Sequence, residues 1–146
     1  MSSIRTKAIQ GLKMGDSFSV SRSFSEKDVE LFAEISQDYN PVHFDERFTQ
    51  VKNFHGRVCH GLLVASLITE IGGQIGWLAS GMSFKFKKPV YFDNTICCEF
   101  TLTAVDEGGR AKAVARFLNE DGHVVIEGEL TGLIPGPRER AVMQSM

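Results

Sequence analysis

The chain has 146 residues, which is enough for one domain with a buried core. Hydrophobic residues make up 42% of it and charged residues 23%, the proportions of an ordinary globular protein, so the composition argues against disorder. The formal net charge of −2 and the lack of a basic run argue against nucleic-acid binding, and no apolar stretch is long enough to cross a membrane.

The start of the chain and its cysteines bear on location. Residues 1–14 contain no apolar signal segment, and we expect them to be flexible. They carry basic residues and no acidic one, which leaves mitochondrial targeting as an alternative to the cytoplasm. The three cysteines are Cys59, Cys97 and Cys98. Their spacing predicts neither a disulfide framework nor a CxxC motif, which favours a reducing compartment and hence the cytoplasm.

The first half of the chain predicts a strand, a short helix and an irregular polar segment. Residues 17–24 alternate between apolar and polar side chains, which is typical of a strand. Ser25 is a typical N-cap for a helix that runs to about Ser36, because acidic residues follow it in the first turn. Asn40-Pro41 ends the helical pattern, since a residue before proline avoids the α region. One further helical turn is expected at residues 45–49 of the polar segment.

The second half predicts one apolar helix followed by strands. Residues 62–76 are apolar on nearly every side, which predicts a helix that its neighbours enclose. After Gly81 the pattern has a period of two, which predicts antiparallel strands at residues 82–87, 95–104, 110–118 and 123–134. Pro135 ends the last strand, and we expect residues 135–146 to be a flexible tail.

This order of elements predicts an α+β fold in which one antiparallel sheet wraps around a long central helix, the hot dog fold. The predicted domain spans residues 15–134. A single curled sheet leaves exposed strand edges, and two copies that pair edge to edge would cover them, so we expect a homodimer.

Asp38 and His43 are the candidate catalytic pair in the polar segment. Pro41 turns the backbone between them, so that two side chains five positions apart can converge on one point. A carboxylate and an imidazole separated by one water molecule can transfer protons in both directions. The spacing alone does not decide the matter, because Asp38 capping a turn and His43 in a hydrogen-bonded core position would produce the same pattern.

Gly61 lies where the predicted apolar helix begins. The first N–H groups of a helix have no intrahelical partner, and the helix dipole favours negative charge beside them. A carbonyl oxygen placed there would be stabilised as it gains negative charge. Glycine also lets a ligand approach the backbone closely. The structural alternative is an ordinary junction between a loop and a helix.

Two blocks of this sequence, DYNPVHFDERF from Asp38 and RVCHGLLVAS from Arg57, together closely resemble the MaoC-like dehydratase family, which includes the (R)-specific enoyl-CoA hydratases. The family's hydratase motif pairs an aspartate with a histidine five positions later through Asn-Pro, which corresponds here to Asp38, Asn40, Pro41 and His43. By this resemblance Asn40 is a candidate substrate-binding residue. The resemblance covers roughly residues 15–134.

The second block implies further substrate-binding residues. Its HG pair opens the central helix of the family and corresponds to His60 and Gly61, and Ser66 falls where the family often has a serine in the pocket. By resemblance, Asp38 and His43 bind the attacking water, and the N–H of Gly61 holds the thioester oxygen.

The function implied by the resemblance is the reversible addition of water to trans-2-enoyl thioesters, which gives (R)-3-hydroxyacyl thioesters. The substrate would be an acyl-CoA or an acyl-acyl-carrier-protein thioester, with no metal or redox cofactor. The acidic and histidine residues of the polar segment lack the HxxxH or HExxH spacing of a metal site. The alternatives are a hot dog thioesterase, against which the Asp-x4-His arrangement argues, and a non-catalytic acyl-thioester binder, which would be expected to lose Asp38 or His43.

Overall fold

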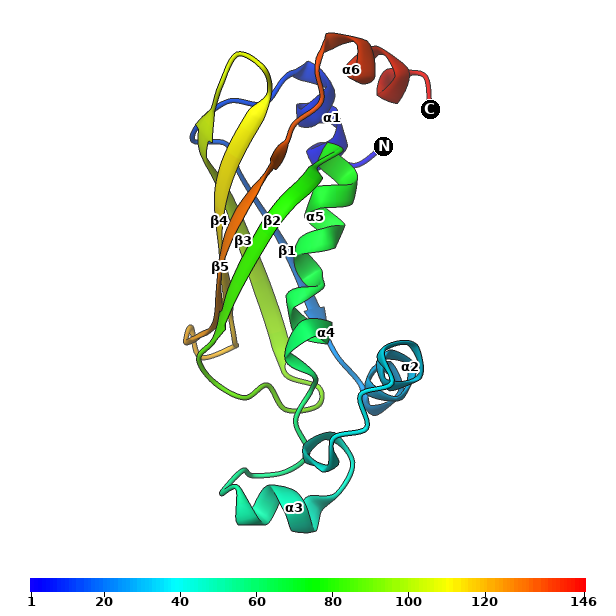
Figure 1. Cartoon of the computed structure of the whole chain (residues 1–146), viewed down its shortest axis with the longest axis vertical. Coiled ribbons are helices and arrows are strands. Elements are labelled where there is room, and N and C mark those ends of the chain that lie inside the picture. Colours follow the sequence, from blue (N-terminus) through cyan, green and yellow to red (C-terminus); the bar gives the residue numbers. More distant parts are fainter.

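Helices α4 and α5 lie along one face of a five-stranded antiparallel sheet, as Figure 1 shows for the computed structural model of residues 1–146. This arrangement confirms the predicted α+β hot dog fold. The strands are β1 (Ser17–Ser23), β2 (Leu78–Phe86), β3 (Thr95–Val105), β4 (Arg110–Leu118) and β5 (Val124–Leu133). The helices are α1 (Ser3–Gln10), α2 (Glu26–Ser36), η1 (Pro41–His43, a 3-10 turn), α3 (Glu46–Val51), α4 (Gly61–Ala65), α5 (Leu67–Ile75) and α6 (Pro137–Gln144). None of these helices has the length and hydropathy that spanning a lipid bilayer requires.

The strand order in the sheet is β1-β3-β4-β5-β2. Strands β3, β4 and β5 form a meander, as the period-two pattern predicts, and their inward side chains alternate with exposed ones. Strand β2 starts at Leu78, earlier than predicted, and pairs with β5 instead of its neighbour in sequence. Strands β1 and β2 are therefore the two edges of the sheet.

The central helix differs from its prediction in two ways. It is broken at Ser66, whose N–H is shared between the carbonyls of Leu62 and Leu63, so that α4 and α5 are separate helices. The sheet covers one side only, where the buried residues are Val64, Ala65, Leu67, Ile68, Ile71 and Ile75. Thr69 and Gly73 are exposed. The prediction that neighbouring elements enclose this helix on every side is therefore wrong for the single chain.

Both ends of the chain are helical, which corrects the predicted flexible start and tail. Ser2 caps α1 by accepting the N–H of Arg5, and Ala8 of α1 is buried in the core. The guanidinium of Arg5 donates to the carbonyls of Gly73 and Gln74, the unpaired end of α5. Helix α6 packs against α1 at the same end of the sheet. These contacts join residues that lie far apart in the sequence. No local pattern in the two short terminal segments therefore predicted the helices.

Residues 26–57, which we call the overhang, extend beyond the opposite end of the sheet (Figure 1). The overhang starts with a capping box at α2, in which Ser25 Oγ accepts the N–H of Asp28 and Asp28 Oδ2 accepts the N–H of Ser25. This is the helix start that the sequence predicts. The overhang carries both candidate catalytic residues.

Candidate active site

Asp38 is presented by a turn that directly follows α2. Gln37 ends the helix in the left-handed conformation, with φ of 60°. Asp38 Oδ1 then accepts the N–H of Asn40 at 3.1 Å, and Asn40 Oδ1 accepts the N–H of Val42 at 3.1 Å. These two side-chain turns start η1, which ends at His43. Asn40 therefore shapes the turn, and it does not line the main cavity as a substrate-binding residue would.

The ring of His43 is oriented by a single backbone carbonyl. Its Nδ1 lies 2.8 Å from the carbonyl oxygen of Val58. A carbonyl can only accept, so Nδ1 carries the hydrogen and Nε2 of the neutral ring carries a lone pair. Burial lowers the pKa of His43 from 6.5, against the opposing effects of the Val58 hydrogen bond and of Asp38. The imidazole is therefore neutral at pH 7.

His43 Nε2 and Asp38 Oδ2 face each other at a distance of 3.7 Å. Neither atom has a hydrogen to donate, since one is the lone pair of a neutral ring and the other belongs to a carboxylate. Water supplies two O–H donors, and hydrogen bonds of about 2.7–3.0 Å allow it to bridge acceptors at such a separation after small shifts. The Asp38 side chain is 46% exposed, which gives solvent access to this position. The fold thus brings the predicted pair together around a place for one water molecule.

His60 supports this pair from the side of the central helix. Its ring stacks on that of His43, with centroids 3.8 Å apart, and its Nε2–H donates to the backbone carbonyl of Asp38 at 3.0 Å. His60 Nδ1 is buried and has no partner. Ligand atoms of Asp38, His43 and His60 lie within 4.8 Å of one another, a grouping able to hold a metal ion that the sequence spacing did not reveal.

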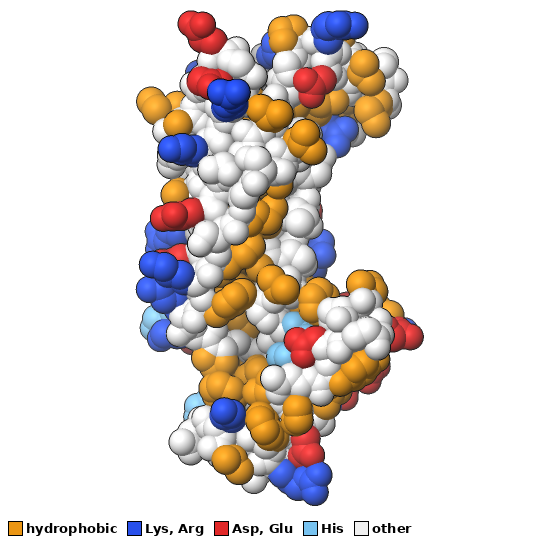
Figure 2. Space-filling view, viewed as in Figure 1, with side chains coloured by type: hydrophobic (Ala, Val, Ile, Leu, Met, Phe, Trp, Pro, Cys, Tyr) orange, Lys and Arg blue, Asp and Glu red, His pale blue; other side chains and the backbone are white.

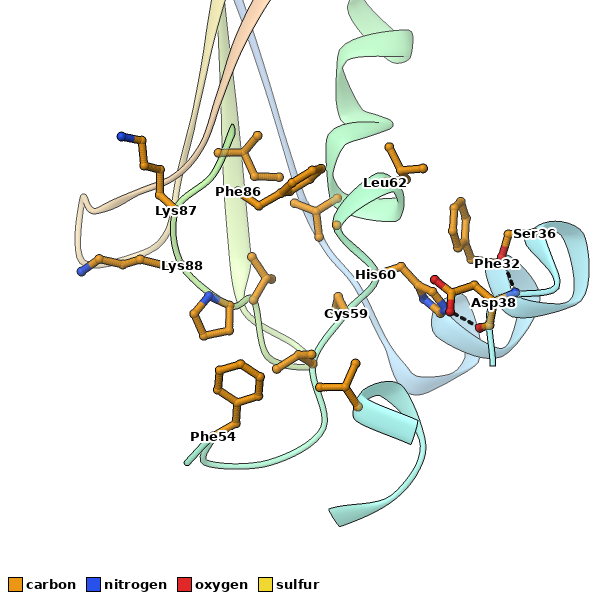
Figure 3. A pocket seen from close by; sticks show the side chains of 17 residues that line it. Phe32, Ser36, Asp38, Phe54, Cys59, His60, Leu62, Phe86, Lys87 and Lys88 are labelled. Atoms are coloured by element: carbon orange, nitrogen blue, oxygen red, sulfur yellow. Dashed lines mark hydrogen bonds between the residues drawn. The ribbon is translucent and has the colours of Figure 1, made fainter. Parts of the chain in front are cut away.

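A cavity of about 760 Å³ opens beside Asp38 and His60 (Figure 3). Ten of its seventeen lining residues are hydrophobic, and they include Phe32, Phe54, Leu62 and Phe86. Cys59 lines it too, and burial raises the pKa of its thiol to about 12, so it is a neutral wall and not a nucleophile. Lys87 and Lys88 lie at the rim, with their ammonium groups pointing away from the other labelled side chains. In Figure 2 histidine and carboxylate atoms adjoin in the recess between the body and the overhang.

Gly61 lines the same cavity and begins α4. No backbone carbonyl accepts the N–H of Gly61 or of Leu62, so these donors are free. The reason for a glycine differs from the expected one, however. A Cβ built on Gly61 would lie 2.6 Å from Cε1 of Phe86, whose ring packs directly against the glycine. The absence of a side chain at Gly61 makes room for the ring of Phe86, in addition to any role in ligand access.

Gly61→Ala is expected to lower the free energy of unfolding by about 1 kcal/mol, the low end of the cost of overpacking, because the colliding Phe86 ring is 54% exposed and can turn aside. The loss should be at most half as large in a Phe86→Ala background, because the colliding ring is then absent. Urea denaturation of the four proteins measures both losses. Equal losses in the two backgrounds would show that the glycine is needed for another reason.

Ser66 does not reach the main cavity. It lies at the junction of α4 and α5, where its Oγ donates to the carbonyl of Leu63, and it borders a separate space of about 190 Å³ beside α2. The expected role of Ser66 in substrate binding has no support from this placement. Arg57 and Val58, which contact His43, were not among the candidates, since only their position in the folded loop reveals them.

Comparisons with known proteins show which family this chain resembles. A family model described as the MaoC like domain matches residues 10–122. An (R)-specific enoyl-CoA hydratase from Rhodospirillum rubrum is 34% identical over 130 residues, which cover 86% of this chain and 90% of that protein. A mitochondrial 3-hydroxyacyl-(acyl-carrier-protein) dehydratase from Arabidopsis thaliana is 33% identical over 141 residues, 92% of this chain and 83% of that protein.

Solved structures show the same likeness. The structure of an (R)-hydratase from A. caviae, described as involved in PHA biosynthesis, superposes with a TM-score of 0.80 and 31% identity, and covers 86% of this chain and 99% of that one. An R-hydratase from Pseudomonas aeruginosa in unliganded form has a TM-score of 0.79 at 27% identity, and covers 87% of this chain and 84% of that one.

Proposed function

The chain belongs to the MaoC-like domain family, and we propose that it is an (R)-specific enoyl-CoA hydratase, a hydro-lyase that reversibly adds water to trans-2-enoyl thioesters to give (R)-3-hydroxyacyl thioesters. One observation carries this proposal. His43 Nε2 and Asp38 Oδ2 are two acceptors 3.7 Å apart. Asp38 lines the apolar cavity, while His43 is only 7% exposed and is not among the lining residues, so water held by the pair would reach an acyl group from the Asp38 side.

Hydration needs two proton movements at this position. The Asp38–His43 pair removes one proton from the bridging water while the water oxygen bonds to C3 of the enoyl group, and it delivers one proton to C2. The balance is one water molecule added, with no other reactant consumed. Elimination runs through the same positions in reverse. Because both groups contact the water, each is expected to contribute to both directions.

The thioester oxygen gains negative charge as C3 is attacked. Gly61 and Leu62 both line the cavity and their N–H groups have no backbone acceptor, and we propose that the Gly61 N–H donates to this oxygen. A donor placed in this way is commonly worth a few kcal/mol in the transition state. The Phe86 ring, which packs on Gly61, would form the apolar wall next to the thioester.

Two acyl carriers fit the relatives, since one is named for CoA and another for acyl carrier protein. We propose an acyl-CoA or acyl-carrier thioester as substrate. We also propose no resident cofactor, because the Asp38–His43 pair can carry both proton transfers itself. One relative is described as mitochondrial and others are bacterial. We therefore propose the cytoplasm as the location, with the mitochondrion as the alternative.

We further propose a homodimer formed across the β2 edge. Leu78, Met82 and Phe86 of β2 are all exposed in the single chain, as is Leu62 of α4. Figure 2 shows hydrophobic side chains gathered along the middle of this face. The open side of α5 lies on the same flank of the sheet as β2. A second copy placed there would cover an unpaired strand edge and an apolar surface at once.

Met82→Glu is expected to raise the dimer dissociation constant at least about tenfold, because it would bury an unpaired carboxylate in the interface. Ile35→Glu is the control, since Ile35 is also an exposed apolar residue, 83% against 46% for Met82, but lies on α2 in the overhang. Sedimentation equilibrium of the three proteins measures the assembly. A wild-type protein that sediments as the 16.2 kDa monomer would contradict the dimer.

Crotonyl-CoA tests the reaction and separates it from the alternatives. A hydratase removes the enoyl ultraviolet absorbance, yields the (R)-3-hydroxy product and releases no thiol. A thioesterase releases free CoA, and a non-catalytic binder does neither. The assay is run before and after dialysis against EDTA, and turnover should be unchanged. Thiol release without a hydrated product would overturn the proposed function.

A further inference from the structure

Arg57, the last residue of the overhang, and Val58, which follows it, hold His43 at two points. Val58 accepts the hydrogen of the ring Nδ1, and Arg57 Nε donates to the backbone carbonyl of His43 at 2.7 Å. The N–H of Val58 also donates to the carbonyl of Val42, one residue before His43. The loop before the central helix therefore fixes both the backbone and the ring of the histidine.

Arg57 is itself held on three sides. Its Nη1 lies 2.7 Å from Glu26 Oε1 at the start of α2. The guanidinium carbon lies 4.8 Å from the ring centroid of Phe92, in the loop between β2 and β3, and 5.4 Å from that of Phe44. The Arg57 side chain is only 18% exposed. Such a set of partners gives the side chain one well-defined position.

The contacts need the chemistry of a guanidinium. Its planar fork donates in two directions at once, here to a carbonyl and to a carboxylate, while its faces pack against aromatic rings. Lysine offers one compact ammonium, and it would satisfy only one of the two oxygens well. The arrangement also links two places that matter for the reaction, because α2 has Glu26 at its start and leads into Asp38 at its end.

We propose that Arg57 is a positioning residue for the hydration reaction. It ties the turn that carries His43 to the helix that carries Asp38, and so sets the separation of His43 Nε2 and Asp38 Oδ2. This inference rests on the proposed function. Arg57 does not touch the substrate position, and it acts only through the orientation of His43. A misplacement of about 1 Å at a reacting group costs up to about 10²-fold in rate.

Arg57→Met tests this, because methionine fills much of the volume but supplies no donor. We expect kcat for crotonyl-CoA to fall about tenfold or more while KM changes by less than about twofold. Arg47→Met is the matched control. Arg47 also lies in the overhang and pairs with an aspartate at 2.7 Å, but it is 90% exposed and does not contact His43. Its kcat should stay within about twofold of the wild type.

A second readout separates positioning from general stability. Long-range ¹H–¹⁵N spectra report which ring nitrogen of His43 carries the hydrogen, and wild type should show hydrogen on Nδ1 only. Arg57→Met should show a mixture of both tautomers, while Arg47→Met should match wild type. An unchanged tautomer, or an unchanged kcat in Arg57→Met, would overturn the inference.

Arg57→Lys serves if the methionine variant does not fold. Arg57→Lys keeps the positive charge, so its kcat and its preference for hydrogen on Nδ1 should lie between those of Arg57→Met and wild type. If Arg57→Met is unfolded, the expected result is that both values for Arg57→Lys fall below those of wild type. Full wild-type kcat and tautomer in Arg57→Lys would overturn the role of the guanidinium fork. The tautomer spectra can be recorded without turnover. A wild-type protein that lacks hydratase activity would refute the proposed function. The spectra alone would then decide whether Arg57 positions His43.

Discussion

Asp38→Asn is expected to lower kcat for enoyl-thioester hydration by about 10²-fold or more, the size associated with a proton-transfer group. Asparagine keeps the Oδ1 atom that accepts the N–H of Asn40, so the turn into η1 is preserved. Its amide nitrogen replaces the oxygen that faces His43 Nε2. A donor then points at the ring lone pair, and the two side chains bond to each other in place of the water.

The measurement is kcat and KM for crotonyl-CoA together with urea unfolding, which should change little because the Asp38 side chain is 46% exposed. Asp45→Asn is the control for an Asp-to-Asn change in the same overhang. Asparagine still caps α3 there, and Asp45 does not line the cavity. Near-normal turnover by Asp38→Asn would remove Asp38 from the reaction.

His43→Gln is expected to cost at least as much, about 10²-fold or more in kcat. A glutamine amide can donate to the carbonyl of Val58 or accept from the water, and it carries no titratable lone pair. His43 is only 7% exposed, so some stability is lost as well, about 1–3 kcal/mol. Activity is therefore compared at equal folded concentration, as given by near-ultraviolet circular dichroism. A variant that keeps wild-type turnover would show that another group moves the proton.

The pH profile gives the same residue a distinct signature. Protonation removes the Nε2 lone pair, so wild-type kcat/KM should fall at acidic pH through the pKa of His43, which burial places below 6.5. His43→Gln should lack this acid limb, and His123→Gln, an exposed control, should retain it. The unfolded chain takes up this proton at higher pH than the folded one, so the same group also lowers stability as the pH falls below 6.5.

Local sequence signals correctly predicted the elements that are stabilised by interactions between residues close together in the chain. The Ser25 cap, the proline turn at Pro41 and the period-two strands all act within a few residues, and each was confirmed. The terminal helices were missed because their stability comes from contacts such as that of Arg5 with the end of α5, nearly seventy residues away. The break at Ser66 was missed because the residues around it remain good helix formers.

The site shows the same division. The closeness of Asp38 and His43 follows from one turn and was predictable. The stacking of His60 on His43, the contact of Phe86 with Gly61 and the clamp formed by Arg57 depend on how the loop before α4 returns to the overhang and on how β2 reaches the helix. The spacing of residues along the chain does not show which distant segments come into contact. The supporting residues were therefore identified only from the folded structure.

The two edges of the sheet differ in a way that bears on polymerisation. The β2 edge is rich in apolar side chains, whereas every second residue of β1, from Ser17 to Ser23, is a serine. The β1 edge therefore offers a further strand little apolar surface to bury. The proposed association through β2 would close after two copies, because a two-fold contact uses the same surface on both. The protein should therefore stay free of fibrous growth even at high concentration.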